Sequence, residues 1–190
     1  MKKYELTSES ITVNGRKLFR IKALRDFSSI KAGDLGGFIE IEDNLNHAGS
    51  AWIFGNAWVY DNAKVSGDAW VYGYARVYDN AIVCGNAAVY DNAEVYGNAK
   101  VFNNAKVYNN AKVRRDARVT ITPIVLDLTY TITITDNNIC IGCQVYDFKT
   151  WKRIYKKIAK NHGMPAKLRN EYFGIIKRLY NFHMEKLKKG

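Results

Sequence analysis

The units AWIFGN (51–56), AWVYDN (57–62), AKVSGD (63–68) and AWVYGY (69–74) open the run that decides the fold of this 190-residue chain. The run continues in one register to Val119 and contains twelve hexads. Each hexad begins with alanine, and Ile53 or a valine stands two residues later. Most hexads end with Asn or Asp, and many place Tyr or Phe directly after the valine. A fixed short period of this kind predicts a solenoid, in which each unit buries its apolar face against its neighbours.

The period of six also predicts the local structure of each unit. The alanine and the valine are two residues apart, so they would point to the same side of a strand. We expect a short strand with the valine facing inward, followed by a corner where Gly, Asn or Asp adopts turn geometry and the small alanine fits. The fold expected is therefore mainly β.

The hexads resemble the repeats of left-handed parallel β-helices, in which a small residue stands two positions before an aliphatic one. The segment GDLGGFIEIEDNLNHAG (33–49), followed by units such as GNAWVY (55–60), is similar to small hexapeptide-repeat proteins of phages and prophages, often labelled as transferases or polymer-forming proteins. This resemblance covers about residues 16 to 150. It implies a single-stranded left-handed β-helix in which three hexads form one coil of about 18 residues.

Residues 1–32 are predicted to form an N-terminal β cap. Apolar runs flank Asn14 and Gly15, a dipeptide typical of two-residue hairpin turns. Such a hairpin would cover the open end of the solenoid, where apolar core and strand edges are otherwise exposed.

Residues 33–122 are predicted to form the β-helix itself, with one irregular coil and four regular ones, about five coils in total. In the irregular coil the hexad register continues in degenerate form. The alanine position would be filled by Gly33, Ile39 and Leu45, and the valine position by Leu35, Ile41 and His47.

Residues 123–146 are β-rich but lack the hexad, and they begin with Pro123, which cannot donate into a strand ladder. A row of threonines alternates with apolar residues there and predicts a half-buried strand. The row consists of Thr129, Thr131, Thr133 and Thr135.

Residues 147–190 have a helical periodicity that predicts two antiparallel helices, with the connection at Gly163 and Pro165. The apolar side expected for the first helix contains Trp151, Ile154, Tyr155 and Ile158. The apolar side expected for the second helix contains Leu168, Tyr172, Ile175, Ile176, Leu179, Phe182 and His183.

The helical hairpin contains nearly all of the chain's excess positive charge. Residues 147–190 include 13 Lys and Arg against 3 Asp and Glu, a net charge of +10 out of +11 for the chain. A basic surface of this kind attracts nucleic acid or an acidic protein surface, although a solvated lysine face gives the same pattern. The candidate binding residues are Lys149, Lys152, Arg153, Lys156, Lys157, Lys160, Lys167, Lys177 and Arg178.

The spacing of 18 residues sorts the outward side chains of the hexads into columns. Two of the three faces are expected to display aromatic columns, which are either interface residues or simple packing between coils. The candidate interface residues are Trp52, Phe54, Trp58, Tyr60, Trp70, Tyr72, Tyr78, Tyr90, Tyr96 and Tyr108.

Signals for an enzyme are weak in this sequence. Hexapeptide acyltransferases use a histidine beside a loop inserted between coils, but the hexads here run without insertion, and we assign His47 no chemistry. Cys140 and Cys143 form a single CxxC, and completing four ligands with His162 and His183 would need a spacing that fits no zinc finger. No P-loop or dinucleotide fingerprint is present, and we expect no cofactor and no metal.

The composition favours a cytoplasmic protein. The N-terminus lacks the apolar segment of a signal peptide, no stretch is long and apolar enough for a membrane span, and three irregularly placed cysteines suggest a reducing compartment.

These features together favour a non-enzymatic binding protein, and the family resemblance implies that it is encoded by a phage or prophage and acts in a bacterial host. The expected role is inhibition of a nucleic-acid-handling defence complex such as a CRISPR effector, an anti-CRISPR function that follows from the family resemblance and the basic charge. The alternatives are a hexapeptide-repeat acyltransferase and a self-assembling structural β-helix protein, and a homo-oligomer fits several of these roles.

Overall fold

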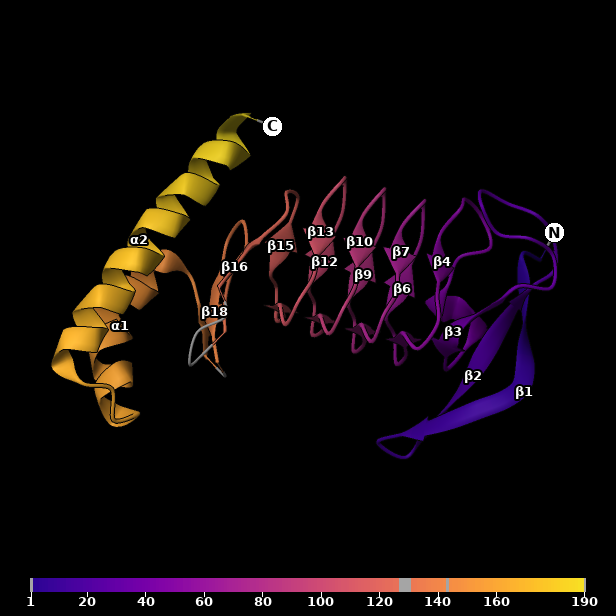
Figure 1. Cartoon of the computed structure of the whole chain (residues 1–190), viewed down its shortest axis with the longest axis horizontal. Helices are drawn as coiled ribbons and strands as arrows, with labels where there is room; N and C mark the ends of the chain where they lie inside the picture. Colours follow the sequence, from indigo (N-terminus) through magenta and orange to yellow (C-terminus); the bar gives the residue numbers. More distant parts are fainter. Residues whose placement is uncertain (1, 127–130, 143, 190) are drawn as a thin grey trace.

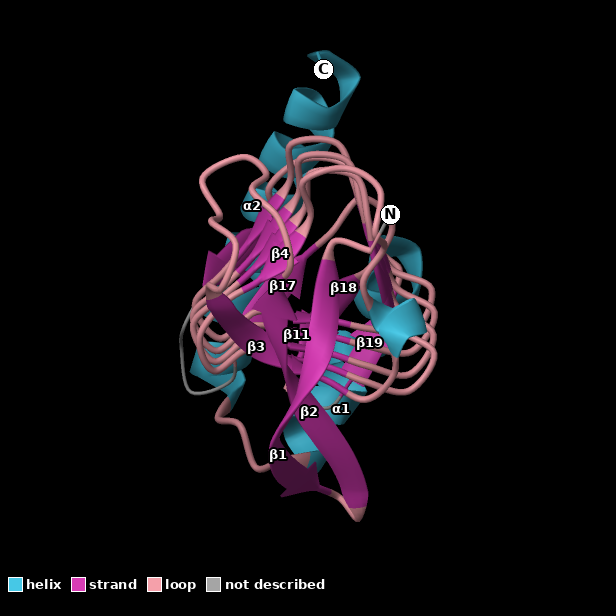
Figure 2. Ribbon diagram, turned by 90° about the vertical axis from the view of Figure 1, so that its right-hand side faces the viewer, coloured by secondary structure: helices cyan, strands magenta, loops and turns pink. Residues whose placement is uncertain are grey.

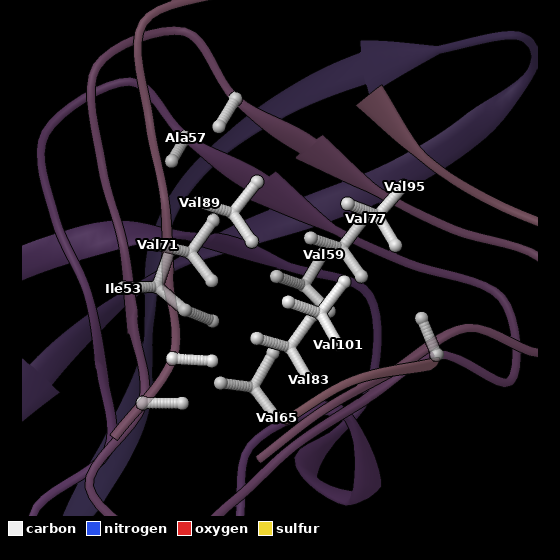
Figure 3. Close-up of a cluster of buried hydrophobic side chains, with 14 of the residues drawn as sticks. Ile53, Ala57, Val59, Val65, Val71, Val77, Val83, Val89, Val95 and Val101 are labelled. Atoms are coloured by element: carbon white, nitrogen blue, oxygen red, sulfur yellow. The ribbon is translucent and has the colours of Figure 1, made fainter. Parts of the chain in front are cut away.

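The valines of the hexads lie in the interior of a β-solenoid (Figures 1 and 3). The computed structural model describes residues 2–126, 131–142 and 144–189. Each hexad forms a two-residue strand whose second residue is Ile53 or the valine, and these side chains and the alanines are almost fully buried. The local structure expected for the hexad is therefore confirmed.

The twelve hexad strands stack into three parallel sheets with a spacing of 18 residues, as in the pairing of Val59 with Val77. We name each sheet by its first hexad strand. The β4 sheet contains β4 (Trp52–Ile53), β7 (Trp70–Val71), β10 (Ala88–Val89) and β13 (Lys106–Val107). The β5 sheet contains β5 (Trp58–Val59), β8 (Arg76–Val77), β11 (Glu94–Val95) and β14 (Lys112–Val113). The β6 sheet contains β6 (Lys64–Val65), β9 (Ile82–Val83), β12 (Lys100–Val101) and β15 (Arg118–Val119). Three hexads thus make one turn, and the solenoid has about five turns.

The corners between the strands have the turn geometry that the sequence predicts. One residue of each corner adopts a positive φ, which Gly, Asn and Asp tolerate best. These residues are Gly55, Asp61, Gly67, Gly73, Asp79, Gly85, Asp91, Gly97, Asn103, Asn109 and Arg115. The residue after each of these is often an asparagine, and such asparagines stack on one another from coil to coil. The Nδ2 of Asn62, for example, donates a hydrogen bond to the Oδ1 of Asn80 at 3.1 Å. The corner loops superimpose when the solenoid is viewed along its length (Figure 2).

The N-terminal hairpin is confirmed and is joined to the solenoid through its backbone. Strands β1 (Tyr4–Val13) and β2 (Arg16–Ala23) pair antiparallel across Asn14 and Gly15, both with positive φ. Strand β2 also pairs antiparallel with β3 (Leu35–Ile39), and β3 pairs parallel with β5. The hairpin therefore extends the β5 sheet at the N-terminal end of the molecule (Figure 1).

The register predicted for the first coil is wrong. Ile39 pairs with Val59 and Leu45 pairs with Val65, so both residues occupy the valine position rather than the alanine position. Leu35 and Ile41 are exposed, with 56% and 46% of their surface accessible. The reason is local: eight residues separate Leu45 from Ile53 instead of six, and the short helix η1 (Glu42–Asn44) forms the preceding corner. His47 consequently lies in a corner loop and not in an inward slot.

An antiparallel sheet covers the last coil of the solenoid. It consists of β16 (Ile124–Leu126), β17 (Ile132–Ile134), β18 (Ile139–Ile141) and β19 (Gln144–Tyr146). The side of Thr133 faces the solenoid, where the Oγ1 of Thr133 accepts a hydrogen bond from the backbone nitrogen of Lys112 at 3.2 Å. The opposite side packs Ile132 and Ile134 against the helices.

The prediction of a half-buried strand in this region is therefore wrong for β17. Ile132, Thr133 and Ile134 are all fully buried, because the sheet is enclosed between the last coil and the helices. Thr129 lies outside the described residues.

The predicted helical hairpin is confirmed as α1 (Phe148–Asn161) and α2 (Ala166–Lys189). Asp147 caps α1 by accepting a hydrogen bond on its Oδ1 from the backbone nitrogen of Thr150 at 2.8 Å. Gly163, in the connection, has a positive φ of 72°. Within the described residues, neither helix combines the length and apolar character needed to cross a bilayer.

The apolar side predicted for α2 is correct in part. Tyr172, Ile176 and His183 are buried and lie four and seven residues apart, so they share one flank of the helix. Phe182 is 51% exposed, and the Nζ of Lys186 lies 4.6 Å from the centroid of its ring. Leu168, in the first turn, is likewise exposed.

Candidate binding surfaces

The six candidate cations of α1 form a basic face, and the opposite side of the helix is packed against the rest of the protein. Trp151 and Tyr155 are buried on the opposite side of the helix, and the Nε1 of Trp151 donates to the backbone oxygen of Ile139 in β18 at 2.7 Å. Burial raises the pKa of Tyr155 to about 12. The face is therefore fixed to the rest of the protein by apolar packing and a buried hydrogen bond. It consists of Lys149, Lys152, Arg153, Lys156, Lys157 and Lys160, all exposed, and we call it the α1 basic face.

The three candidate cations of α2, Lys167, Lys177 and Arg178, are exposed as well. In the part of the chain that the structure describes, none of the nine candidate cations pairs with a carboxylate. Their charge is consequently available to a partner.

Two shallow depressions lie along α1, and cations line both. One contains Lys149, Lys152 and Arg153 beside Asp147 and Thr150. The other lies between the end of α1 and the start of α2 and is lined by Lys156, Lys157, Lys160, Ala166, Arg169 and Asn170. Arg169 is a candidate that sequence reasoning missed, since its place beside the end of α1 depends on how the hairpin folds back.

The positive charge is concentrated in the C-terminal half of the molecule. Residues 1–98 contain 10 basic and 12 acidic residues, whereas residues 99–190 contain 19 basic and 6 acidic residues. Because the solenoid is elongated, this difference runs along its length: the last coils and the helices are basic and the first coils are slightly acidic (Figure 1). Such a charge distribution orients the C-terminal end toward a polyanion.

One aromatic column lies on the β4 sheet. The rings of Tyr72 and Tyr90 are stacked with centroids 4.7 Å apart and planes within 2°, and Tyr90 and Tyr108 are stacked at 5.4 Å. Phe54 meets Tyr72 edge to face at 6.5 Å. Stacking along the column places the ring faces of these tyrosines against one another, so mainly ring edges are directed to solvent. This geometry favours packing between coils as the role of the column.

A second aromatic column lies on the β5 sheet. Tyr60 stacks on Tyr78 at 5.1 Å and Tyr78 on Tyr96 at 4.8 Å, and the guanidinium of Arg114 lies 5.9 Å from the ring centroid of Tyr96. Burial, followed by the charge of Glu94, raises the pKa of Tyr78 above its usual range. The column is thus continued by a cation at its C-terminal end.

Two aromatic candidates are buried and do not form an exposed interface. Trp52 is 1% exposed because Tyr4 and Phe27 of the N-terminal segment pack on it edge to face. Tyr60 is 5% exposed because it packs in a cluster with Leu18 of β2. Expecting them to be exposed was wrong, because segments distant in sequence cover them.

Trp58 and Trp70 have different surroundings. Trp58 is half-buried and lies under the guanidinium of Arg76, 4.8 Å from the ring. Trp70 is 39% exposed, and Tyr74, in the next corner, is 63% exposed. Tyr74 was missed by sequence reasoning because it occupies a turn position that contains Asn or Asp in the other hexads up to residue 116.

His47 belongs to the packing of the N-terminal segment. Its Nδ1 accepts a hydrogen bond from the backbone nitrogen of Lys3 at 3.1 Å, and its ring stacks on Tyr4 at 4.4 Å. Burial lowers the pKa of His47, which matches a neutral ring that accepts this hydrogen bond.

Lys3 is a buried cation that sequence reasoning did not single out. Its Nζ donates to the backbone oxygen of Ala51 at 2.7 Å, and its side chain is fully buried. Burial, followed by the charge of Arg25, lowers its pKa to about 8. Lys3 satisfies a carbonyl group at the start of the regular hexads, which is a structural role.

The CxxC pair can be described only in part, since Cys143 lies outside the described residues. Cys140 is buried on the side of the sheet that faces the last coil and interacts with Arg114. Across the described ranges, no group of three or more His, Cys, Asp or Glu side chains is arranged to hold a metal ion.

The fold defines the protein as a β-solenoid with a basic helical end. No protein-family model matches the chain, and no curated protein matches its sequence.

Proposed function

We propose that this protein is a non-enzymatic binding protein that docks on an acidic partner through its C-terminal helices. The observation that carries the proposal is the α1 basic face: six exposed cations without an acidic neighbour in pairing distance among the described residues, on a helix anchored by Trp151. The carboxylate of Asp147 lies beside one end of the face, where it accepts hydrogen bonds from Thr150. The six cations still outnumber it, and an anionic partner relieves their repulsion.

The partner that fits the charge and the family resemblance is a nucleic-acid-handling complex of a bacterial host, such as a CRISPR effector. Resemblance to hexapeptide-repeat proteins of phages and prophages supports a role in the host cytoplasm. The same resemblance supports a left-handed solenoid, and the unbroken hexads from residue 51 support a binding role over an acyltransferase.

The experiment is capture of partners from bacterial host lysate by three forms of the full-length protein. The α1 variant replaces Lys152, Arg153, Lys156 and Lys157 by Gln, which removes four charges while keeping helix propensity. The control variant replaces Lys17, Lys64, Lys100 and Lys106 by Gln, which removes the same charge from exposed positions outside the helices.

We expect the wild type and the control variant to retain the same partner and the α1 variant to lose it, with equal thermal stability in all three. Equal capture by all three forms would mean that the α1 basic face is only a solvated surface. Equal loss in the two variants would reduce the effect to net charge.

A further inference from the structure

We infer that the α1 basic face binds the phosphate backbone of duplex DNA, independently of sequence. This inference rests on the proposed function and names the partner's chemistry at the same surface. Four observations carry it: the spacing of the cations, the position of the aromatic rings, the composition of the face, and the direction of the charge gradient.

The cations are spaced along α1 in a way that suits a phosphate backbone. From Lys149 to Lys160 the helix rises about 16 Å, and each strand of a DNA duplex presents one phosphate for about every 3.4 Å of the duplex axis. The first depression contains the cations of the first half of α1 and the second those of the second half, so together the two depressions involve the whole length of the face. Several phosphates of one backbone segment therefore lie within reach of the face at once, and both depressions can be occupied together.

The aromatic residues of α1 are turned away from this surface, and the exposed ring of Phe182 lies in the second half of α2. Single-stranded nucleic acid is usually bound by stacking bases on exposed aromatic rings. Trp151 and Tyr155 are buried, and the ring of Phe148 is stacked on Tyr180 at 4.2 Å. The α1 basic face thus offers charge and few stacking platforms, which favours a duplex, whose bases are already stacked, over a single strand.

The composition of the face also favours DNA over double-stranded RNA and over acidic protein. Recognition of RNA duplexes uses hydrogen bonds to 2′-hydroxyl groups. The face consists of six cations, and the other polar residues that line its depressions are Asp147, Thr150, Arg169 and Asn170. A face of this composition binds a dense and regular array of negative charge. The charge of a DNA duplex is denser and more regular than that of a folded acidic protein.

The charge gradient orients the molecule for this contact. Residues 99–190 have a net charge of +13 and residues 1–98 a net charge of −2. In the field of a polyanion the solenoid would point its C-terminal end, where the helices lie, toward the DNA (Figure 1).

The test is fluorescence anisotropy with the full-length protein and four labelled probes: a 24-base-pair DNA duplex of arbitrary sequence, one of its single strands, an RNA duplex of the same sequence, and polyglutamate. Salt is varied from about 50 to 200 mM, where phosphate contacts change affinity most. We expect the DNA duplex to bind tightest, with a slope of log K against log salt of about −4 to −5, the value for four to six neutralised phosphates. A second duplex of unrelated sequence should bind equally.

The two variants then locate the site. The α1 variant should weaken duplex binding by about 100-fold at low salt and reduce the magnitude of the slope by about 3 to 4, since each contact contributes about 0.9. The control variant should change both values little. Both variants should melt like the wild type, since all eight substituted side chains lie outside the apolar clusters.

Three results would overturn the inference. Absence of DNA binding at low salt is one, tighter binding of single-stranded DNA, RNA duplex or polyglutamate is the second, and an unchanged slope in the α1 variant is the third. If duplex binding fails while a nuclease-resistant partner is still captured through the four substituted residues, the inference falls and the proposed function stands. If the α1 variant behaves like the wild type in both assays, both fall.

Discussion

A methyl group placed on Gly97 would lie 2.7 Å from the backbone nitrogen of Arg115, the equivalent corner residue one coil further along the solenoid. Gly97 has a φ of 70° and Arg115 a φ of 60°, so the two stacked corner residues share the same left-handed backbone conformation. Asp79 occupies the equivalent corner one coil earlier, where its carboxylate accepts a hydrogen bond from the backbone nitrogen of Gly97 at 2.9 Å. An alanine at position 97 would bring the added methyl group without such a hydrogen bond.

The Gly97→Ala variant should therefore be destabilised by two separate effects. The positive φ contributes about 1 to 2 kcal/mol for an L-residue, and the contact with Arg115 adds about 1 to 3 kcal/mol of overpacking. Gly55→Ala is the matched control, since Gly55 has a φ of 56° but nothing within 4 Å of the added methyl group. Urea unfolding of both variants measures the difference, and equal losses would mean that the corner can move apart at no cost.

The core makes a second prediction. Val89 is fully buried in a column of valines, so Val89→Asp buries a carboxylate without a partner and should abolish the cooperative fold of several coils. Ala88→Asp, one residue earlier, places the same group on the outer side of the strand and should remain folded. Circular dichroism and thermal melting distinguish the two; a Val89→Asp variant that melts like the wild type would contradict the register of the hexads.

The sequence predicted the regular hexads well because each one carries its own signal. Alanine and valine repeat at every coil, so the inward positions from Ala51 to Val119 are specified locally. The register of the first coil was predicted incorrectly because two additional residues before Ile53 shift it, and no residue pattern in the sequence indicates this insertion. The burial of Trp52 and Tyr60 depends on segments more than 20 residues away, which the repeat does not encode.

The candidate site divides in the same way. Exposure of the α1 basic face followed from helical periodicity, because opposite sides of one helix are fixed by spacing alone. The position of Arg169 beside Lys160, by contrast, depends on how the hairpin turns at Gly163. Complete burial of β17 could not be predicted either, since it results from layers packed on both of its sides.

The aromatic column gives a third prediction, which separates packing from interface. Tyr72 and Tyr90 stack within the same molecule, and burial raises the pKa of both. Replacing either by Ser should lower stability, and a double-mutant cycle should give a coupling of about 0.5 to 1.5 kcal/mol. Light scattering should show the same mass for all variants. A change in mass or in partner binding without a loss of stability would instead identify the column as an interface.

Lys3 gives a prediction about pH. Its pKa is lowered from 10.5 to about 8 in the folded protein, so between these pH values the unfolded chain binds more protons at this group. The contribution of Lys3 to the unfolding free energy should therefore be lowest below pH 8, and it should rise as the pH increases toward 10.5. The measurement is the difference in unfolding free energy between the wild type and Lys3→Met at several pH values, in which tyrosine ionisation cancels.

Lys2→Met is the control for this experiment, because Lys2 is exposed and its Nζ pairs with Glu42 at 2.6 Å. We expect the unfolding free energy of the wild type to rise relative to that of Lys3→Met as the pH increases from 8 to 10. The difference between the wild type and Lys2→Met should show no such trend. A difference that stays constant with pH would mean that Lys3 is not desolvated in the folded state.

The last prediction concerns how α2 is attached to the solenoid. Asp136 lies between the last coil and the helix: its Oδ2 accepts hydrogen bonds from the backbone nitrogen and the Oγ1 of Thr120, both at 2.8 Å, and its Oδ1 lies 3.4 Å from the Nε2 of buried His183. Removing a buried, charged hydrogen-bond partner costs about 1 to 3 kcal/mol.

Because α1 is fixed independently through Trp151 and Ile139, Asp136→Ala should loosen the second half of α2 and leave α1 in place. Amide hydrogen exchange should then accelerate in residues 176–189 and stay unchanged in 148–161 and in the hexads, whereas Asn181→Ala, on the exposed side of α2, should have no effect. Unchanged exchange in α2 of the Asp136→Ala variant would show that apolar packing through Ile176 alone holds the helix.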